Sequence, residues 1–295
     1  MTRALTSGGA VVALESTIFS NLGLPSPSNR EALERCVAAV RATGAVPAVT
    51  AVLDGEARVG LTPGEHERIL GAARKVGERD LGVAVAQGWA FGATTVSAAL
   101  AMADIAGVSV FATGGIGGVH RGADITGDVS ADLDVMARRP VVTVCAGAKA
   151  FLDLGRTLEH LETHGVPVLG FGHDWFPAFY TRSSGLPVPH RVDSADEAAA
   201  AFEQRARVNG GLLVAVPIPA NAELDPAELD AVLSSALADA DHAGITGAAV
   251  TPFVLGRIAS ATEGRSIPAN LALAENNALV AGAIAVALAR RRAHP

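Results

Sequence analysis

The chain has 295 residues, of which 49% are hydrophobic and only 4% aromatic, and its formal net charge at pH 7 is −7. This length can bury a large core, and the acidic balance excludes a basic surface of the kind that binds nucleic acid. The two cysteines lie far apart, and no N-terminal apolar stretch is long enough for an export signal or a membrane span, so we expect a cytoplasmic protein with reduced thiols.

Short apolar runs alternate with helical patterns along the chain. This alternation predicts an α/β protein with a largely parallel sheet covered by helices on both faces. No repeat or linker interrupts it, so we expect residues 1–295 to form a single domain. The runs predicted as strands are residues 10–14, 46–53, 82–85, 108–113, 141–145, 166–171 and 212–216. The predicted helices are residues 30–43, 63–76, 95–106, 149–163 and 226–243, followed by one or two helices over about residues 267–292.

The first candidate for chemistry is Glu15, at the end of the first predicted strand. Partial burial there would raise the pKa of its carboxyl group toward neutrality and suit it to proton transfer. A helix cap or a structural ion pair is the alternative interpretation. Later in the chain, small residues at 92–96 predict a turn that opens a helix, where backbone N–H groups would suit a phosphate or simply be capped by a threonine.

A glycine-rich segment, residues 112–122, follows the strand predicted at 108–113. It has four glycines within five residues and then His120 and Arg121, a proton carrier beside a fixed anion binder. Its spacing matches neither a Walker loop nor a dinucleotide fingerprint. The next segment, residues 127–134, carries three carboxylates and a hydroxyl, which predict either a hard divalent cation site or an acidic helix start.

Only two of the 23 basic residues are lysines, Lys75 and Lys149, and the other 21 are arginines. Lysine can lose its proton in an apolar site and form an imine with a carbonyl, which arginine cannot do. Lys149 follows a hydrophobic strand among small residues, whereas Lys75 lies among charges and would suit an anionic substrate. Together these residues suggest a phosphorylated sugar handled through an imine, and they leave aldolase, isomerase and lyase open.

Several long motifs, in order, resemble the pseudouridine-5′-phosphate glycosidase (indigoidine synthase A-like) family over nearly the whole chain. The resemblance implies a three-layer α/β/α sandwich with a large mixed, mostly parallel sheet, assembled as a homotrimer. The implied activity is reversible cleavage of the C–C glycosidic bond of pseudouridine 5′-phosphate to uracil and ribose 5-phosphate, with Mn²⁺. The matching motifs are ALEST at 13–17, ATGGIGGVHRG at 112–122, SADL at 130–133, CAGAK at 145–149, FPAFYTRSSG at 176–185, GITG..VTPF at 244–253 and the asparagines 276–277.

The resemblance also implies roles for individual residues. Lys149 resembles the lysine that forms the imine with ribose C1′ after ring opening, and Glu15 the general acid/base. His120 is expected to be a second proton carrier, and Asp128 the Mn²⁺ ligand, with water completing its shell and Asp132 as the second choice. The residues implied to contact substrate are Lys75, Val96, Thr113, Ser130, Ala131, Asp132 and Asn277.

The chain departs from the family pattern at three places, which leaves the base or phosphate preference open. Asn21 stands where the family usually has a histidine, Gly77 and Glu78 replace a serine and an arginine, and residues 216–221 lose an amide and two acids. Two alternatives therefore remain: an imine-forming lyase or aldolase for another sugar phosphate or C-nucleotide, and a non-catalytic nucleotide-binding relative.

Overall fold

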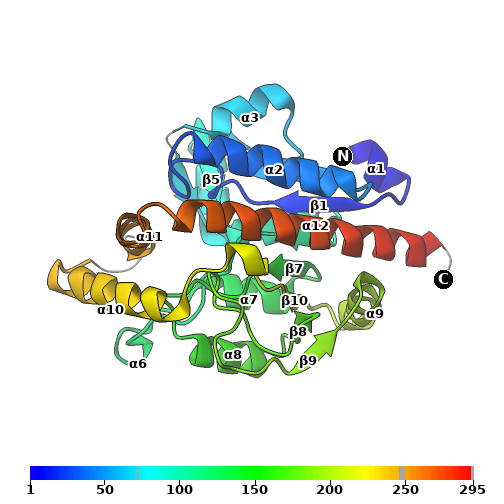
Figure 1. Ribbon diagram of the computed structural model, residues 1–295. Coiled ribbons are helices and arrows are strands. Elements are labelled where there is room, and N and C mark those ends of the chain that lie inside the picture. Colours follow the sequence, from blue (N-terminus) through cyan, green and yellow to red (C-terminus); the bar gives the residue numbers. More distant parts are fainter. Residues whose placement is uncertain (72, 246–249, 294–295) are drawn as a thin grey trace.

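A computed structural model describes residues 1–71, 73–245 and 250–293. It confirms the predicted α/β sandwich: ten strands form one mixed sheet with helices on both faces (Figure 1). Seven of the nine strand pairings are parallel. The strands, in spatial order, are β4 (Arg74–Val76), β5 (Phe91–Thr94), β2 (Val46–Leu53), β1 (Val11–Leu14), β6 (Val110–Ala112), β7 (Val142–Cys145), β10 (Leu212–Ala215), β8 (Val168–Phe171) and β9 (His190–Val192), with β3 (Glu56–Val59) also paired to β2.

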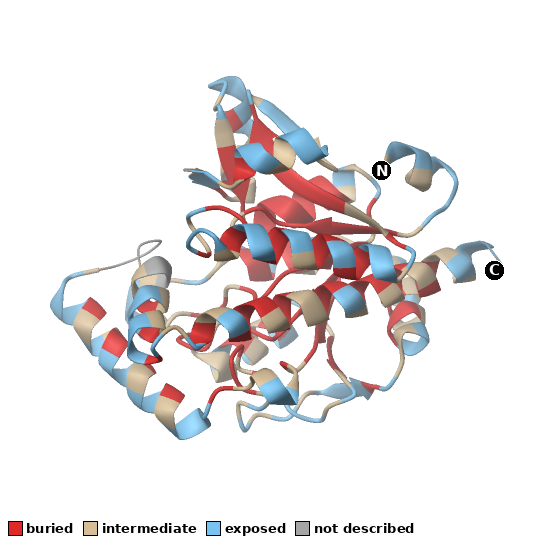
Figure 2. Ribbon diagram, turned by 45° about the horizontal axis from the view of Figure 1, so that its top comes forward, coloured by how far each residue is buried: buried red, intermediate tan, exposed pale blue. Residues whose placement is uncertain are grey.

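The helices form two groups on the sheet. On one face α12 packs against α2 and α9 and crosses β1, β6 and β7; on the other, α5 packs against β1, β6 and α7. The two long helices α2 and α12 lie over the sheet and bury the sides that face it (Figure 2), whereas α10 packs against α11. The helices are α1 (Thr2–Thr6), α2 (Ser28–Ala42), α3 (Pro63–Ile69), α4 (Leu81–Ala86), α5 (Val96–Ile105), α6 (Ala123–Thr126), α7 (Ala131–Arg138), α8 (Leu154–Thr163), α9 (Ala195–Ala206), α10 (Pro226–His242), α11 (Val250–Ala261) and α12 (Ser266–Ala293), with short 3₁₀ turns η1 (Glu78–Asp80) and η2 (Ala220–Ala222).

The candidate site lies in a notch at one edge of the sheet, where the short strand β1 ends beside the longer strand β2. β1 ends at Leu14, opposite Val49, whereas β2 continues to Leu53. β5 runs antiparallel to this overhanging end of β2, so its last residue, Thr94, returns toward the end of β1. The carboxyl ends of β1, β6 and β7 are therefore approached from the opposite direction by β5 and its parallel neighbour β4.

The final helix, α12, is a core element. With 28 residues and a mean hydropathy of 1.7 over its most apolar window, it is long and apolar enough to cross a membrane. However, 67% of that window is buried inside the protein, against α2, α9 and the central strands. The helix predicted for about residues 267–292 is therefore one continuous helix, and its apolar side is covered by this chain.

Three sequence predictions of secondary structure are wrong, two of them near the start of the chain and one at Lys149, where the predicted helix begins only at Leu154. Residues 82–85, predicted as a strand, lie in helix α4, because a four-residue apolar run has no periodicity that separates the two. The helix predicted to continue to residue 76 ends at Ile69, and residues 74–76 form strand β4. Strands β3, β5 and β9, which are short or have mixed burial, were not predicted from the sequence.

The close approach of α12 to the end of α2 predicts that Gly282→Ala is destabilising. A Cβ on Gly282 would lie 2.3 Å from Thr43 Oγ1 and 3.1 Å from Thr43 Cβ, so rotation of that side chain cannot make room. We expect a loss of about 1–3 kcal/mol. The matched control is Gly256→Ala in α11, where a Cβ meets no atom within 4 Å, and helix propensity predicts a gain of about 0.5–1 kcal/mol. Calorimetric unfolding of both variants measures this, and equal effects would contradict the close packing.

Candidate active site

Glu15 and Thr113 form the centre of the candidate site. Leu14 of β1 pairs with Ala112 of β6, so the two residues that follow these strands emerge side by side. Both are buried, and the Thr113 hydroxyl donates a hydrogen bond to Glu15 Oε1. The carboxyl group thus has a fixed position at the end of the sheet rather than the freedom of a surface cap.

A buried cluster of hydroxyl groups fixes the backbone after Glu15. Ser16 N donates to Thr94 Oγ1 at 3.2 Å, and Thr94 N donates back to Ser16 Oγ at 3.0 Å. Thr50 Oγ1 lies 2.8 Å from Thr94 Oγ1 and donates to the Leu14 carbonyl. Thr50 was not predicted as a site residue, although it lies within the apolar run predicted as a strand at 46–53. Thr94 belongs to the segment 92–96 that was predicted to open a helix, but it ends strand β5, and its hydroxyl contacts Ser16 and Thr50.

Lys149 is held beside the glycine-rich loop. Ile116 N donates to the Gly147 carbonyl at 3.1 Å, and Lys149 N donates to the Ile116 carbonyl at 3.2 Å. Glycine is required for this approach, because a Cβ on Gly115 would lie 2.4 Å from the Phe179 ring. Lys149 was predicted to begin a helix, but α8 begins only at Leu154, so the lysine lies in the turn after β7.

Asp132 connects three segments. Its Oδ1 accepts a hydrogen bond from Ser97 N, near the start of α5, and its Oδ2 accepts one from Gly117 N of the loop, both at 2.9 Å. Ser130 caps α7 by accepting from Asp132 N, and its own N–H donates to the Gly118 carbonyl. Both oxygens of Asp132 are thus already engaged by the protein.

Three further residues predicted to contact substrate occupy different environments. Asn277, fully buried on α12, donates through Nδ2 to the carbonyls of Thr113 (2.8 Å) and Gly114 (3.1 Å). Its Oδ1 has no hydrogen-bond partner within the described residues. Val96 is buried at the start of α5, and Ala131 is exposed at the start of α7.

The electrostatics of the site favour proton transfer by Glu15. The pKa of its carboxyl group is raised from 4.5 to about 7, mainly by burial and to a smaller extent by the charge of Asp132. The positive charge of Lys149, the Thr113 hydrogen bond and the charge of Lys75 oppose this rise. A carboxyl group with this pKa can both donate and accept a proton near neutral pH.

Lys75 belongs to the same electrostatic cluster. It lies on the edge strand β4, and desolvation by surrounding protein atoms, followed by the charge of Lys149, lowers its pKa. The carboxylates of Asp132 and Glu15 act in the opposite direction. The structure therefore brings both lysines of the chain within electrostatic reach of one buried carboxyl group.

His120 and Asp128 lie at the outer side of this cluster. Their side chains are 3.8 Å apart (Nδ1 to Oδ2), and His120 N donates to the Asp128 carbonyl. Burial lowers the pKa of His120, Asp128 raises it, and the charges of Lys149 and Lys75 lower it. The imidazole therefore favours its neutral form, which can accept a proton.

The donors around Asp128 fit a water-rich cation site. Its carboxylate is partly exposed, and the two oxygens of Asp132 are taken by backbone N–H groups. A hard divalent cation that keeps several waters can bind through one carboxylate. Across residues 1–71, 73–245 and 250–293, the only group of three or more metal-binding side chains within mutual reach is Asp134, His160 and His164, which does not include Asp128.

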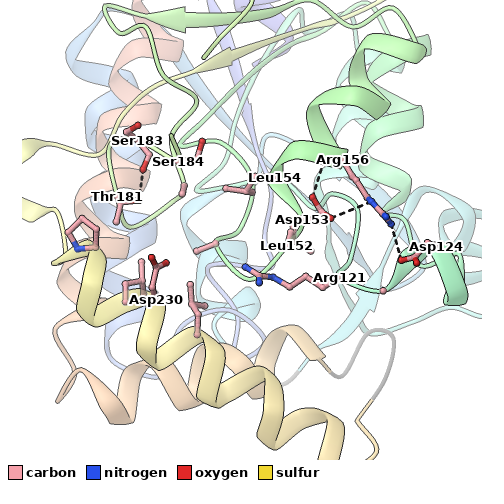
Figure 3. A pocket seen from close by; sticks show the side chains of 16 residues that line it. Arg121, Asp124, Leu152, Asp153, Leu154, Arg156, Thr181, Ser183, Ser184 and Asp230 are labelled. Atoms are coloured by element: carbon pink, nitrogen blue, oxygen red, sulfur yellow. Dashed lines mark hydrogen bonds and ion pairs between the residues drawn. The ribbon is translucent and has the colours of Figure 1, made fainter. Parts of the chain in front are cut away.

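A cavity of about 570 Å³ lies beside the site, between α10, the 181–184 loop and the turn after Lys149 (Figure 3). Its walls carry Arg121 and Ala150, the chain neighbours of His120 and Lys149, but none of the predicted site residues. A second, much smaller cavity of about 10 Å³ touches Glu15 and Thr113 directly. The position of the candidate active site therefore rests on the cluster of side chains around Glu15, because the larger cavity contains none of them.

Comparison with known proteins identifies the family. Residues 1–287 match the model described as indigoidine synthase A like protein. The chain belongs to this family. Pseudouridine-5′-phosphate glycosidases from Methylobacterium nodulans and Herpetosiphon aurantiacus are each 52% identical to it, over 97% of this chain and 85% and 95% of their own lengths. The resemblance inferred from the motifs is confirmed, and so is the expectation of an enzyme of this type.

Two solved structures share the fold over nearly the whole chain. The prealnumycin C-glycosynthase AlnA, in complex with ribulose 5-phosphate, superposes with a TM-score of 0.92 at 38% identity, covering 100% of this chain and 96% of AlnA. An indigoidine synthase A-like protein from Thermotoga maritima gives 0.87 at 36% identity, covering 96% of this chain and 94% of its own. Members of this fold therefore include an enzyme named for C-glycoside formation.

The raised pKa of Glu15 predicts that Glu15→Gln stabilises the protein in a pH-dependent way. The folded-state pKa lies above the unfolded value, so Glu15 costs no stability below pH 4.5, and the cost is complete above pH 7. We expect Glu15→Gln to be neutral near pH 4 and to gain about 3 kcal/mol near pH 8. Chemical unfolding at both pH values measures the gain.

The matched control has the opposite sign. Hydrogen bonds from Thr62 lower the pKa of Glu65 to about 2, so Glu65→Gln should be destabilising at pH 8 and less so as the pH falls. A Glu15→Gln effect that does not change between pH 4 and pH 8 would contradict the assignment of a raised pKa.

Proposed function

We propose that the protein catalyses the reversible cleavage of the C–C glycosidic bond of pseudouridine 5′-phosphate, giving uracil and ribose 5-phosphate through an imine at Lys149. The observation that carries this proposal is the buried Glu15 carboxyl group, with a pKa of about 7 and within electrostatic reach of Lys149. The substrate is suggested by the curated relatives at about 50% identity, whose names specify it.

A C–C glycosidic bond has no heteroatom leaving group on the base, so protonation alone does not break it. In the proposed reaction Glu15 protonates the ring oxygen O4′, and the C1′–O4′ bond opens. The Lys149 amine bonds to C1′, and the resulting ammonium group gives a proton back to the Glu15 carboxylate. The lone pair of the Lys149 nitrogen then forms the C1′=N bond while the C1′–C5 bond breaks and C5 of uracil takes a proton.

Water then hydrolyses the iminium, which releases the aldehyde of ribose 5-phosphate and returns the Lys149 amine. One water is consumed and no electrons are exchanged with an outside partner. In the reverse direction, C5 of uracil attacks the iminium carbon. Glu15 is suited to both directions because a carboxyl group with a pKa near 7 is both an acid and a base at neutral pH.

The surrounding residues have supporting roles in this proposal. His120, which favours its neutral form, is a second proton carrier. Lys75, on strand β4 beside the site, is proposed to bind the phosphate or the base through its positive charge. Asp132 and Asn277 also position the loops around the site, because their side chains form hydrogen bonds with backbone groups there. The remaining residues proposed to contact substrate are Val96, Thr113, Ser130, Ala131, Asp132 and Asn277.

Asp128 is proposed to hold one Mn²⁺ per subunit, with water as its other ligands. Such an ion, when bound, supplies positive charge that neutralises an anionic oxygen. The partly exposed carboxylate and the imidazole 3.8 Å away support this placement. The side chain of His120 would then lie next to the cation and its water shell.

One alternative within the fold has a specific observation in its favour. AlnA, a C-glycosynthase solved with ribulose 5-phosphate, shares 38% identity with this chain, so a different C-nucleotide is the second candidate substrate. The changes at Asn21, Gly77, Glu78, Val216 and Ala220 mark positions where the base or phosphate preference differs in such an enzyme.

The proposal also covers the organisation of the protein. We propose that residues 1–295 form a single domain, that the protein assembles as a homotrimer, and that it is soluble and cytoplasmic.

Replacing Lys149 by arginine tests the imine. The guanidinium group would keep the positive charge but lacks a usable amine, so we expect uracil release to fall by a factor on the order of 10³ or more. Borohydride reduction in the presence of ribose 5-phosphate should attach the sugar covalently to Lys149 of the unmodified enzyme, as detected by peptide mass spectrometry. Lys75→Arg is the matched control and should still be labelled at Lys149. Turnover retained in Lys149→Arg would refute the imine.

Replacing Asp128 by asparagine tests the metal. The neutral amide is a weaker ligand for a hard cation, so the Mn²⁺ concentration that gives half-maximal uracil release should rise by about 10-fold or more. Asp134→Asn, on the same segment but outside the proposed site, is the control and should leave this concentration unchanged. An unchanged requirement in Asp128→Asn would remove Asp128 as the ligand.

A further inference from the structure

Three metal-binding side chains gather on the outer surface, on helices α7 and α8. Asp134 lies on α7, His160 lies in the last turn of α8, and His164 is the residue that ends α8. The His160 and His164 Nε2 atoms are 3.5 Å and 3.7 Å from the same atom, Asp134 Oδ1. All three donor atoms lie within 4.8 Å of one another.

This spacing approaches the geometry of a coordination shell. Bonds of about 2.0–2.1 Å to a tetrahedral Zn²⁺ place neighbouring ligand atoms about 3.3 Å apart. The two distances to Asp134 exceed this by only about 0.2–0.4 Å, which small side-chain rotations can close. Residues four apart on a helix share one face, so His160 and His164 present their rings together, with centroids 4.3 Å apart.

The surroundings favour a cation, and the ligand types indicate which one. Both imidazoles lie at the carboxyl end of α8, where the helix dipole is negative. Two imidazoles and one carboxylate suit Zn²⁺, Ni²⁺ or Cu²⁺, whereas Mg²⁺ and Mn²⁺ prefer oxygen ligands. We propose that Asp134, His160 and His164 form a second metal site, for a Zn²⁺-like divalent transition-metal ion.

The site is separate from the proposed catalytic centre. Asp132 and Asp134 are two residues apart on α7, which turns the helix by about 200°. Asp132 is accordingly buried against the glycine-rich loop, whereas Asp134 is exposed on the outer side. A metal ion bound here would link α7 to α8, which pack together. It would thereby stabilise α7, which carries Asp132 on its opposite side.

The first test is Zn²⁺ binding to the untagged, metal-free protein by isothermal titration calorimetry. We expect one saturable site per chain, and a loss of affinity of at least about 10-fold in His160→Ala and in His164→Ala. His190→Ala, which changes an exposed histidine on the edge strand β9 that is not part of this cluster, should bind as the unchanged protein does. Asp128→Asn should also retain the site, which separates it from the proposed Mn²⁺ ligand.

The second test uses two readouts that an ion pair between Asp134 and the histidines would not produce. Zn²⁺ should raise the melting temperature of the unchanged protein and not that of the His160→Ala,His164→Ala variant. Cu²⁺ bound to the protein should show coupling to two nitrogens by electron paramagnetic resonance. Absence of saturable binding at millimolar Zn²⁺, or a Zn²⁺ affinity that is unchanged in both histidine variants, would overturn the proposal. Neither test involves the substrate, so its outcome is independent of the proposed reaction.

Discussion

Burial of the Glu15 carboxyl group is the constraint on which the site depends. Moving a carboxylate out of water is costly unless hydrogen bonds or opposite charges compensate. Here the compensation is partial: Thr113 supplies a hydrogen bond and the two lysines supply charge, yet desolvation still dominates and the pKa settles at about 7. With full compensation the carboxyl group would stay ionised and could not act as an acid. With no compensation it would stay protonated and could not act as a base.

The mixed sheet provides this partial compensation from several strands at once. Thr113 follows β6, Lys149 follows β7, and Lys75 lies on β4, which reaches the notch only because β5 turns back along the overhang of β2. In a purely parallel sheet the functional groups come from loops at the carboxyl ends of the strands. The antiparallel return of β5 adds groups from the opposite direction, and Thr94 uses that position to fix the backbone after Glu15.

The buried central strands could be predicted from the sequence because each is a continuous apolar run. β4 and β5 could not: Arg-Lys-Val on an exposed edge and Phe-Gly-Ala-Thr in a short buried strand carry no alternating pattern. Their position is determined by pairing with β2, which is a long-range interaction. The motifs likewise identified Asp132 and Asn277, but their partners are backbone groups of distant segments, and no side-chain pattern encodes such partners.

The positions of those two side chains explain how a loop with four glycines in five residues can hold a lysine precisely. Asn277, on α12, donates to the Gly114 carbonyl, and Asp132, on α7, accepts from Gly117 N. The two helices lie on opposite faces of the sheet, so the loop is held at both ends from both sides (Figure 1). Between these two points Ile116 is fully buried and accepts the hydrogen bond from Lys149 N. The glycines therefore serve close approach, because a Cβ at Gly115, Gly117 or Gly118 would collide with neighbouring atoms, while hydrogen bonds at Gly114, Ile116 and Gly117 fix the backbone of the loop.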